Sequence, residues 1–128
     1  MMKLSAAYRP FIVLVLIASL TWSCGKSKGE LLLGVWKVTE LDLSGTKLTG
    51  DQINMTYEFD KTGNFSRSED GKSEKGTYEI NTETGMLIFK FADLDLVAEK
   101  KIEQISNDRL ILSGEEFSMQ QTLTMQRQ

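Results

Sequence analysis

The sequence lacks histidine altogether, and its 128 residues include one cysteine, Cys24, and one proline, Pro10. Without histidine the chain cannot build a histidine general base, a histidine metal site or a Ser/His/Asp triad. A single cysteine excludes an internal disulfide and a cysteine-rich zinc site. The side chains that most often carry hydrolytic or metal chemistry are therefore missing.

Charge of one sign is also not in large excess, since 15 Lys and Arg residues stand against 18 Asp and Glu residues. Binding to nucleic acid needs a concentrated basic surface, so we expect no nucleic-acid partner. The carboxylates Asp93 and Asp95, and the neighbours Glu115 and Glu116, are typical of turns and solvated faces, and no third metal ligand accompanies them. We therefore expect no enzyme activity, no metal site and no cofactor.

Residues 1–23 have the organisation of a signal peptide. Lys3 and Arg9 supply positive charge, and residues 11–20 form an apolar run that precedes Ser23. A positive start, a short apolar run and a small residue before the cleavage point are typical of such segments. A membrane-spanning helix needs roughly 20 apolar residues, so a membrane anchor or a buried helix is the less favoured interpretation.

Cys24 directly follows this segment. Residues 20–24 resemble a bacterial lipobox, which implies cleavage before Cys24, a diacylglycerol on its thiol, and acyl chains such as palmitate. Ordinary cleavage near Ser23, leaving a free thiol, is the alternative; a lone thiol is a liability in an oxidising compartment, which favours lipidation. We therefore predict a lipidated Cys24, a flexible tether over residues 24–30, and a lipid-anchored protein of the bacterial cell envelope that faces the periplasm.

Apolar and polar residues alternate from Gly34 onward, as in strands, and no segment shows a helical period. Turn signals such as Asp60–Gly63 and Asn81–Gly85 make the connections short, which favours antiparallel neighbours. The prediction is an all-β domain over residues 31–128, a small eight-stranded antiparallel up-and-down barrel; a sandwich is the alternative. The predicted strands span residues 31–43, 55–59, 64–68, 76–81, 86–91, 94–105, 109–113 and 117–127, with exposed loops at 44–51 and 69–75 and a turn at 114–116.

Three motifs suggest a family. Gly34-x-Trp36 opens the first strand, and residues 57–65 (YEFDKTGNF) are followed by residues 76–80 (GTYEI). In this order and spacing they resemble the lipocalin-like domains of bacterial lipoproteins. The resemblance implies that Arg127, on the mostly apolar face of the last strand, packs on Trp36 in a structural role. The alternative is that Arg127 lies in solvent near the chain end.

The barrel interior is the predicted functional surface. Small eight-stranded barrels either fill with side chains or hold one small ligand. Aromatic and methionine side chains suit a hydrophobic ligand, which is the first hypothesis. The second is a protein-interaction module or hydrolase inhibitor of the envelope, with a filled barrel and with the loops at 44–51 and 69–75 as its contact surface. The side chains predicted to contact a ligand are Val38, Tyr57, Phe59, Phe65, Tyr78, Phe89, Phe91, Met119 and Leu123.

Overall fold

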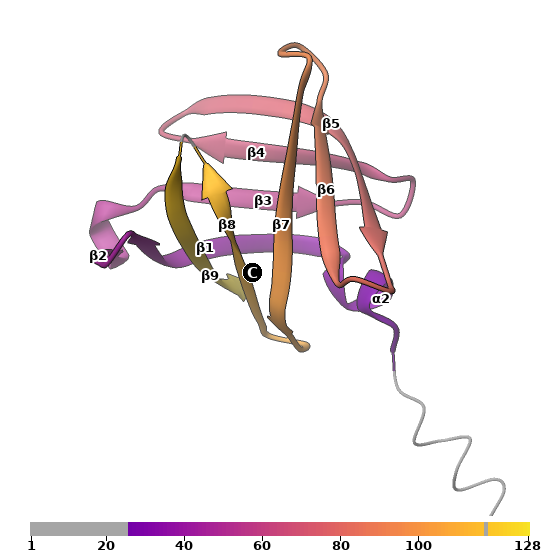
Figure 1. The fold of residues 1–128 in the computed structure, drawn as a ribbon, viewed down its shortest axis with the longest axis horizontal. Coiled ribbons are helices and arrows are strands. Elements are labelled where there is room, and N and C mark those ends of the chain that lie inside the picture. Colours follow the sequence, from indigo (N-terminus) through magenta and orange to yellow (C-terminus); the bar gives the residue numbers. More distant parts are fainter. Residues whose placement is uncertain (1–25, 117) are drawn as a thin grey trace, which may run out of the picture.

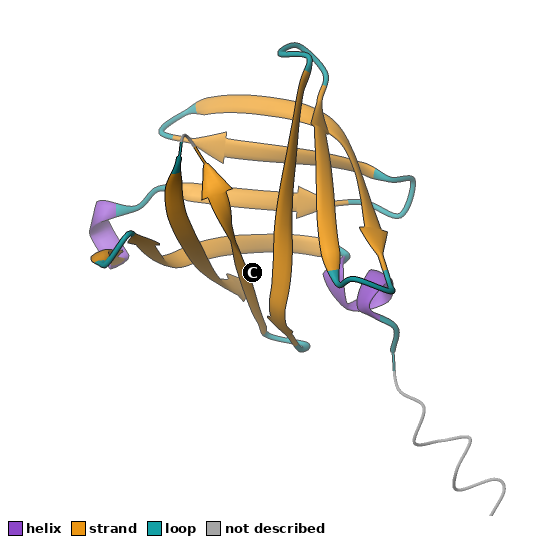
Figure 2. Ribbon diagram, viewed as in Figure 1, coloured by secondary structure: helices purple, strands orange, loops and turns teal. Residues whose placement is uncertain are grey.

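The computed structural model describes residues 26–116 and 118–128, and this part of the chain is almost entirely strand (Figures 1 and 2). The signal segment and Cys24 lie outside the described residues. Among the described residues, no helix is long and apolar enough to cross a membrane. The elements are α2 (Lys28–Leu32), β1 (Gly34–Leu43), β2 (Thr46–Thr49), the 3-10 turn η1 (Gly50–Gln52), β3 (Met55–Phe59), β4 (Asn64–Glu69), β5 (Lys72–Asn81), β6 (Met86–Phe91), β7 (Leu96–Ile105), β8 (Arg109–Glu116) and β9 (Met119–Arg127).

The strands form one antiparallel sheet that closes on itself. β1 pairs with β3, the strands from β3 to β9 then pair in sequence order, and β9 returns to β1. β2 is an additional short strand beside the second half of β1, so eight strands make the closed cylinder. The register shifts between Val38 and Glu40 in β1 and between Ile102 and Gln104 in β7, as it does at a β-bulge. The predicted all-β, up-and-down barrel is therefore confirmed, and the sandwich is not formed.

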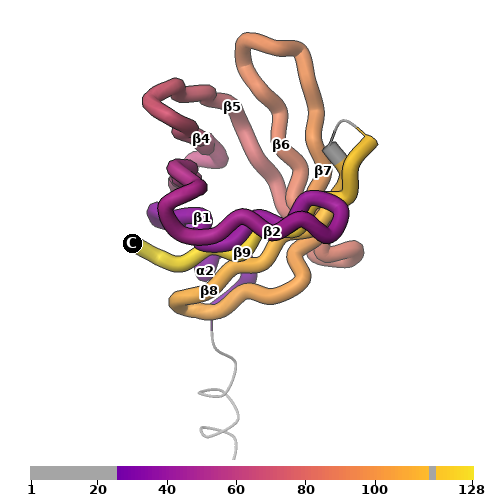
Figure 3. Tube along the Cα trace, turned by 90° about the vertical axis from the view of Figure 1, so that its left-hand side faces the viewer, coloured from indigo at the N-terminus to yellow at the C-terminus, as the bar shows by residue number. Residues whose placement is uncertain are grey.

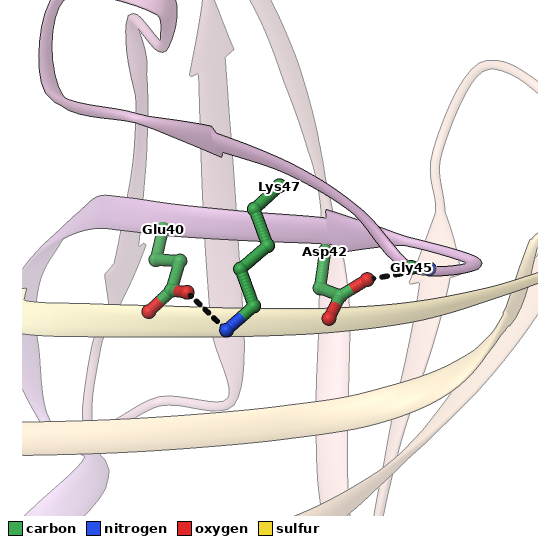
Figure 4. Close-up of polar contacts among 4 residues, drawn as sticks. All are labelled: Glu40, Asp42, Gly45 and Lys47. Atoms are coloured by element: carbon green, nitrogen blue, oxygen red, sulfur yellow. Dashed lines mark hydrogen bonds and ion pairs between the residues drawn. The ribbon is translucent and has the colours of Figure 1, made fainter.

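The segment predicted as the loop 44–51 forms a hairpin with β1 instead (Figure 4). Asp42 accepts a hydrogen bond from the Gly45 amide at 2.8 Å, which holds the tight turn. Lys47 pairs with Glu40 at 3.5 Å across the two strands. The prediction was wrong because Thr46–Thr49 has little apolar alternation, and its pairing depends on the free edge of β1 beyond β3.

Other boundaries also differ from the prediction. The first strand, β1, begins at Gly34 and not at residue 31, because residues 28–32 form the helix α2. This helix lies partly in the segment 24–30 that was predicted to be a flexible tether. Ser27 caps this helix by accepting a hydrogen bond from the Glu30 amide at 3.3 Å. The predicted loop at 69–75 is a two-residue turn, Asp70 and Gly71, between β4 and β5. The predicted turn at 114–116 belongs to β8, which continues to Glu116.

Aromatic rings fill the core between β3, β4, β5 and β6. Phe65 meets Phe89 and Phe91 edge to face, with ring centroids 4.9 and 5.3 Å apart. Gly76 lies between Phe65 and Phe91 in the register of the sheet. A Cβ atom at Gly76 would lie 1.9 Å from the Lys90 carbonyl oxygen and 2.9 Å from the Phe65 ring, so only glycine allows this packing.

Candidate functional site: one closed and one open barrel end

The end of the barrel that carries α2 is closed by Trp36 and Arg127. Their strands place them opposite one another in register, and the guanidinium carbon lies 4.3 Å from the centre of the Trp36 ring. Trp36 is fully buried, and its indole N–H donates to the Leu32 carbonyl at 2.8 Å. Arg127 donates to the Leu33 carbonyl at 2.5 Å and also to the carbonyls of Leu31 and Asn107. The predicted structural contact is present, and Arg127 does not lie free in solvent.

Gly34 is part of the same closure. Its φ of +120° is a conformation that side-chain-bearing residues rarely adopt, and a Cβ atom there would lie 2.7 Å from Nη1 of Arg127. The glycine of Gly-x-Trp thus lets the guanidinium approach the backbone where α2 meets β1. All three residues predicted to be structural, Gly34, Trp36 and Arg127, meet at this end.

The opposite end holds a cavity of about 400 Å³. Its lining residues come from the ends of the strands that are remote from α2. The β6–β7 turn lies on the side of the barrel away from α2 (Figures 1 and 3). The volume falls within the roughly 300–1,000 Å³ of small-molecule sites. The cavity is lined by Leu41, Leu43, Met55, Tyr57, Arg67, Glu69, Glu74, Phe91, Leu94, Leu96, Met119 and Gln121.

One wall of the cavity carries a polar row. Arg67 pairs in register with Tyr57 on β3 and with Glu74 on β5. Its Nη2 contacts Oε2 of Glu74 at 2.6 Å, and its guanidinium carbon lies 5.2 Å from the centre of the Phe91 ring. The Arg67 side chain is only 16% exposed, whereas that of Glu74 is 39% exposed. The ion pair therefore runs from the barrel interior toward its mouth.

A second polar contact lies between β7 and β9. Lys100 is 5% exposed, and its ammonium donates to Oε1 of Gln121 at 2.5 Å. The strand between them carries Gly114, whose missing side chain leaves room for Lys100, since a Cβ atom there would lie 3.2 Å from its Cδ. Gln121 lines the cavity, but Lys100 does not. Lys100 thus holds the Gln121 amide in place at the cavity wall.

The nine predicted ligand-contact residues separate into two groups. Tyr57, Phe91 and Met119 line the cavity, although Met119 is 42% exposed at its rim. The other six do not line it. Tyr78 is partly buried and donates its hydroxyl to the Asp60 carbonyl at 2.6 Å, so this hydroxyl supports the β3–β4 turn. The remaining residues are buried in the core: Val38, Phe59, Phe65, Phe89 and Leu123.

Four polar residues of this end were missing from the prediction: Arg67, Glu74, Lys100 and Gln121. The signal was present in the alternation, because each has the inward parity of its strand. Arg67 follows Phe65 by two residues, Lys100 stands between Ala98 and Ile102, and Gln121 precedes Leu123 by two. A charged residue in phase with buried neighbours needs a partner inside the barrel.

A further hollow and a group with a shifted pKa lie outside the barrel interior. A hollow of about 500 Å³ lies on the outer face of β3 to β5 beside Glu58, Ser66 and Lys75, outside the barrel. Hydrogen bonds, the strongest from the Thr62 hydroxyl, lower the pKa of Asp60, and these bonds close the β3–β4 turn. Within the described residues, no group of three or more carboxylate or thiol side chains could hold a metal ion.

The sequence matches one known protein family. The family model of the lipocalin-like domain matches residues 32–112, which is more than half of the chain. The chain belongs to this lipocalin-like domain family. A search of curated proteins finds no match.

Solved structures share the lipocalin-like fold at low sequence identity. A lipocalin-like protein from Bacteroides uniformis is 19% identical with a TM-score of 0.61, over 77% of this chain and 99% of that chain. An uncharacterised protein from Bacteroides eggerthii is 12% identical with a TM-score of 0.58, over 76% of this chain and 99% of that one. A further Bacteroides uniformis protein, solved by NMR, is 13% identical with a TM-score of 0.55, over 77% and 91% of the two chains. At these identities the likeness establishes the fold alone.

Proposed function

We propose that this lipocalin-like barrel binds or carries one small hydrophobic or amphipathic molecule in the cavity of its open end. The observation that carries the proposal is the 400 Å³ cavity, bounded mainly by aliphatic, aromatic and methionine side chains. Most of the barrel is packed, so the cavity is confined to the end remote from Trp36. Its size favours a small ligand, one held by a few polar groups at the wall.

We further propose that the protein is held at the periplasmic side of the envelope by acyl chains on Cys24. Three residues separate Cys24 from Lys28, where α2 begins, so a lipid there would hold the closed end of the barrel near the membrane. The cavity lies at the far end, and its mouth would face the aqueous compartment. The ligand would then enter from the aqueous side rather than directly from the bilayer.

Incorporation of alkynyl palmitate into the native chain and into Cys24→Ser tests the anchor. The native chain should incorporate the label and fractionate with membranes. Cys24→Ser should incorporate none and appear in the soluble fraction. Equal labelling of the two chains would contradict lipidation at Cys24.

Native mass spectrometry of the protein from its own membrane tests ligand binding. We expect an adduct of one small molecule per chain. Organic extraction should remove this molecule, and its fragmentation should reveal a hydrophobic tail. Absence of an adduct, together with no saturable uptake of a hydrophobic probe by the extracted protein, would contradict the proposal.

An interaction module is the second candidate function, and one observation favours it. Leu94 and Leu96 line the cavity and are 57% and 47% exposed, and the adjacent Val97, which does not line it, is 56% exposed. A cluster of this kind often marks a protein contact. Cross-linking in cells should then recover one envelope protein at equal stoichiometry with the native chain, and lose it with Leu94→Ser/Val97→Ser. Recovery of no such protein would contradict this function.

A further inference from the structure

We infer that the ligand is an amphiphile with an uncharged, hydrogen-bonding head, such as a hydroxyl or an amide, rather than a carboxylate or an ammonium. This inference rests on the proposed binding function and names its ligand class. It comes from the polar groups of the cavity and from how their charges are already used.

Among the described residues that line the cavity, Arg67 is the only cation, and it already contacts a carboxylate. Its Nη2 lies 2.6 Å from Oε2 of Glu74. A ligand carboxylate would have to displace Glu74 or lie beside it, and the exposed Glu69 lines the same cavity. Like charges at such separations repel one another, most strongly where water is partly excluded. The lining thus opposes an anionic head.

A cationic head finds no better partner. Glu74 is engaged by Arg67, and Glu69 is exposed at the rim, where solvent screens its charge. Moving an ionised head from water into the cavity is costly unless a partner there compensates for the lost hydration.

An uncharged head can form hydrogen bonds with the polar groups of the same cavity. The Gln121 amide can both donate and accept hydrogen bonds, and the Arg67–Glu74 pair combines donors with acceptors. Gln121 is only 9% exposed and is fixed by Lys100. Aliphatic side chains such as Leu41, Leu43 and Met55 border these groups and would contact the tail.

Calorimetric titration of three eight-carbon probes tests the inference: 1-octanol, octanoate and octylammonium, at about pH 7, where the last two are ionised. The protein is the chain from residue 26 on, because all the described strands and the closed core lie within it. We expect 1-octanol to bind at least about tenfold more tightly than either charged probe, a difference of about 1.4 kcal/mol. Tighter or equal binding of a charged probe would overturn the inference while leaving the binding function intact. If none of the three bound, the binding function itself would fail.

Glu74→Gln tests the part played by the ion pair. The variant replaces the Glu74 carboxylate with a neutral amide, which removes one negative charge that repels the carboxylate of octanoate. We expect octanoate affinity to rise at least about fivefold and 1-octanol affinity to change less than about twofold. Glu79→Gln is the matched control, since Glu79 is exposed on the outer face of the same strand and pairs with Lys90 at 3.7 Å; it should change neither affinity. An unchanged octanoate affinity in folded Glu74→Gln would contradict the inference, and if that variant did not fold, the three-probe comparison would still decide.

Discussion

At the scale of single residues, Arg127 joins three segments that are distant in sequence. It stacks on Trp36 of β1, bonds to carbonyls at the end of α2, and reaches Asn107 in the β7–β8 turn. A guanidinium suits this position because its planar fork donates in several directions while its face packs on an indole. The closed end is therefore a point where helix, first strand and last strand are fixed together.

A double-mutant cycle measures the Trp36–Arg127 contact. Trp36→Phe and Arg127→Met should each destabilise the fold, and Arg127→Met should cost about 2 to 3 kcal/mol because partly buried carbonyls lose a charged donor. The two losses should not add, with a coupling energy of about 0.5 kcal/mol or more, because phenylalanine is a weaker cation–π partner. Urea denaturation of the four chains provides the values, and strict additivity would show that the stacking contributes nothing.

Gly34→Ala tests the close approach of the Arg127 guanidinium to Gly34, the glycine of Gly-x-Trp. Strain at positive φ should cost about 1 to 3 kcal/mol, and displacement of the Arg127 side chain should add about 1 kcal/mol or more. Gly45→Ala is the control, because its φ is +96° and nothing lies within 4 Å of the added Cβ. Equal destabilisation of the two variants in urea would mean that the arginine contact is unimportant.

At the scale of elements, local turn chemistry was predictable and pairing to a distant edge was not. Asp60–Gly63 and Asn81–Gly85 form the predicted turns. The side chains of Asp60 and Asn81 accept hydrogen bonds from amides two residues further on, and both glycines have a positive φ. β2 was missed because its partner residues on β1 become available only where β3 ends. α2 was missed because five residues are too few to show a period, and the helix depends on burial of Leu32.

Ionisation of Tyr78, which bonds to the β3–β4 turn, should destabilise the barrel at alkaline pH. Burial first, and the negative charge of Asp60 second, raise the pKa of Tyr78 above its usual value. A group with a raised folded-state pKa stabilises the fold below its unfolded pKa of about 10 and loses that contribution as the pH rises through the folded value. Urea denaturation from about pH 8 to 11 should therefore show a steeper loss of stability for the native chain than for Tyr78→Phe. Parallel curves would contradict the assignment.

Gly76→Ala should disrupt the β5–β6 pairing. The added Cβ would lie 1.9 Å from a backbone carbonyl, which cannot move independently of the sheet, so we expect a loss of more than about 2 kcal/mol. Gly114→Ala is the graded control, because its closest contact would be 3.0 Å. Thermal unfolding compares the two, and an equal or larger loss in Gly114→Ala would contradict this reading of the packing.

At the scale of the whole molecule, closure was predictable and the open end was not. Eight short antiparallel strands, with Gly-x-Trp in the first and an inward arginine in the last, led to the barrel and its closed end. Whether the interior is filled depends on the side-chain volumes relative to the barrel volume, which the alternation of apolar and polar residues does not give. Phe59, Phe65 and Phe89 are buried in the core, whereas the same alternation places Arg67 and Gln121 beside a cavity. The division of the barrel into a packed half and a hollow half thus emerged only from the three-dimensional structure.

The most direct test of the account is the binding of 1-octanol to two tryptophan variants of the same strand. Leu43 lines the cavity, whereas Val35 is exposed on the outer face of β1 and does not line it. We predict saturable binding at one site per chain for the native protein and for Val35→Trp. Binding should be at least about tenfold weaker for folded Leu43→Trp, whose indole would fill the cavity. Undiminished binding to Leu43→Trp, or no saturable binding to the native chain, would contradict a ligand site at the open end of the barrel.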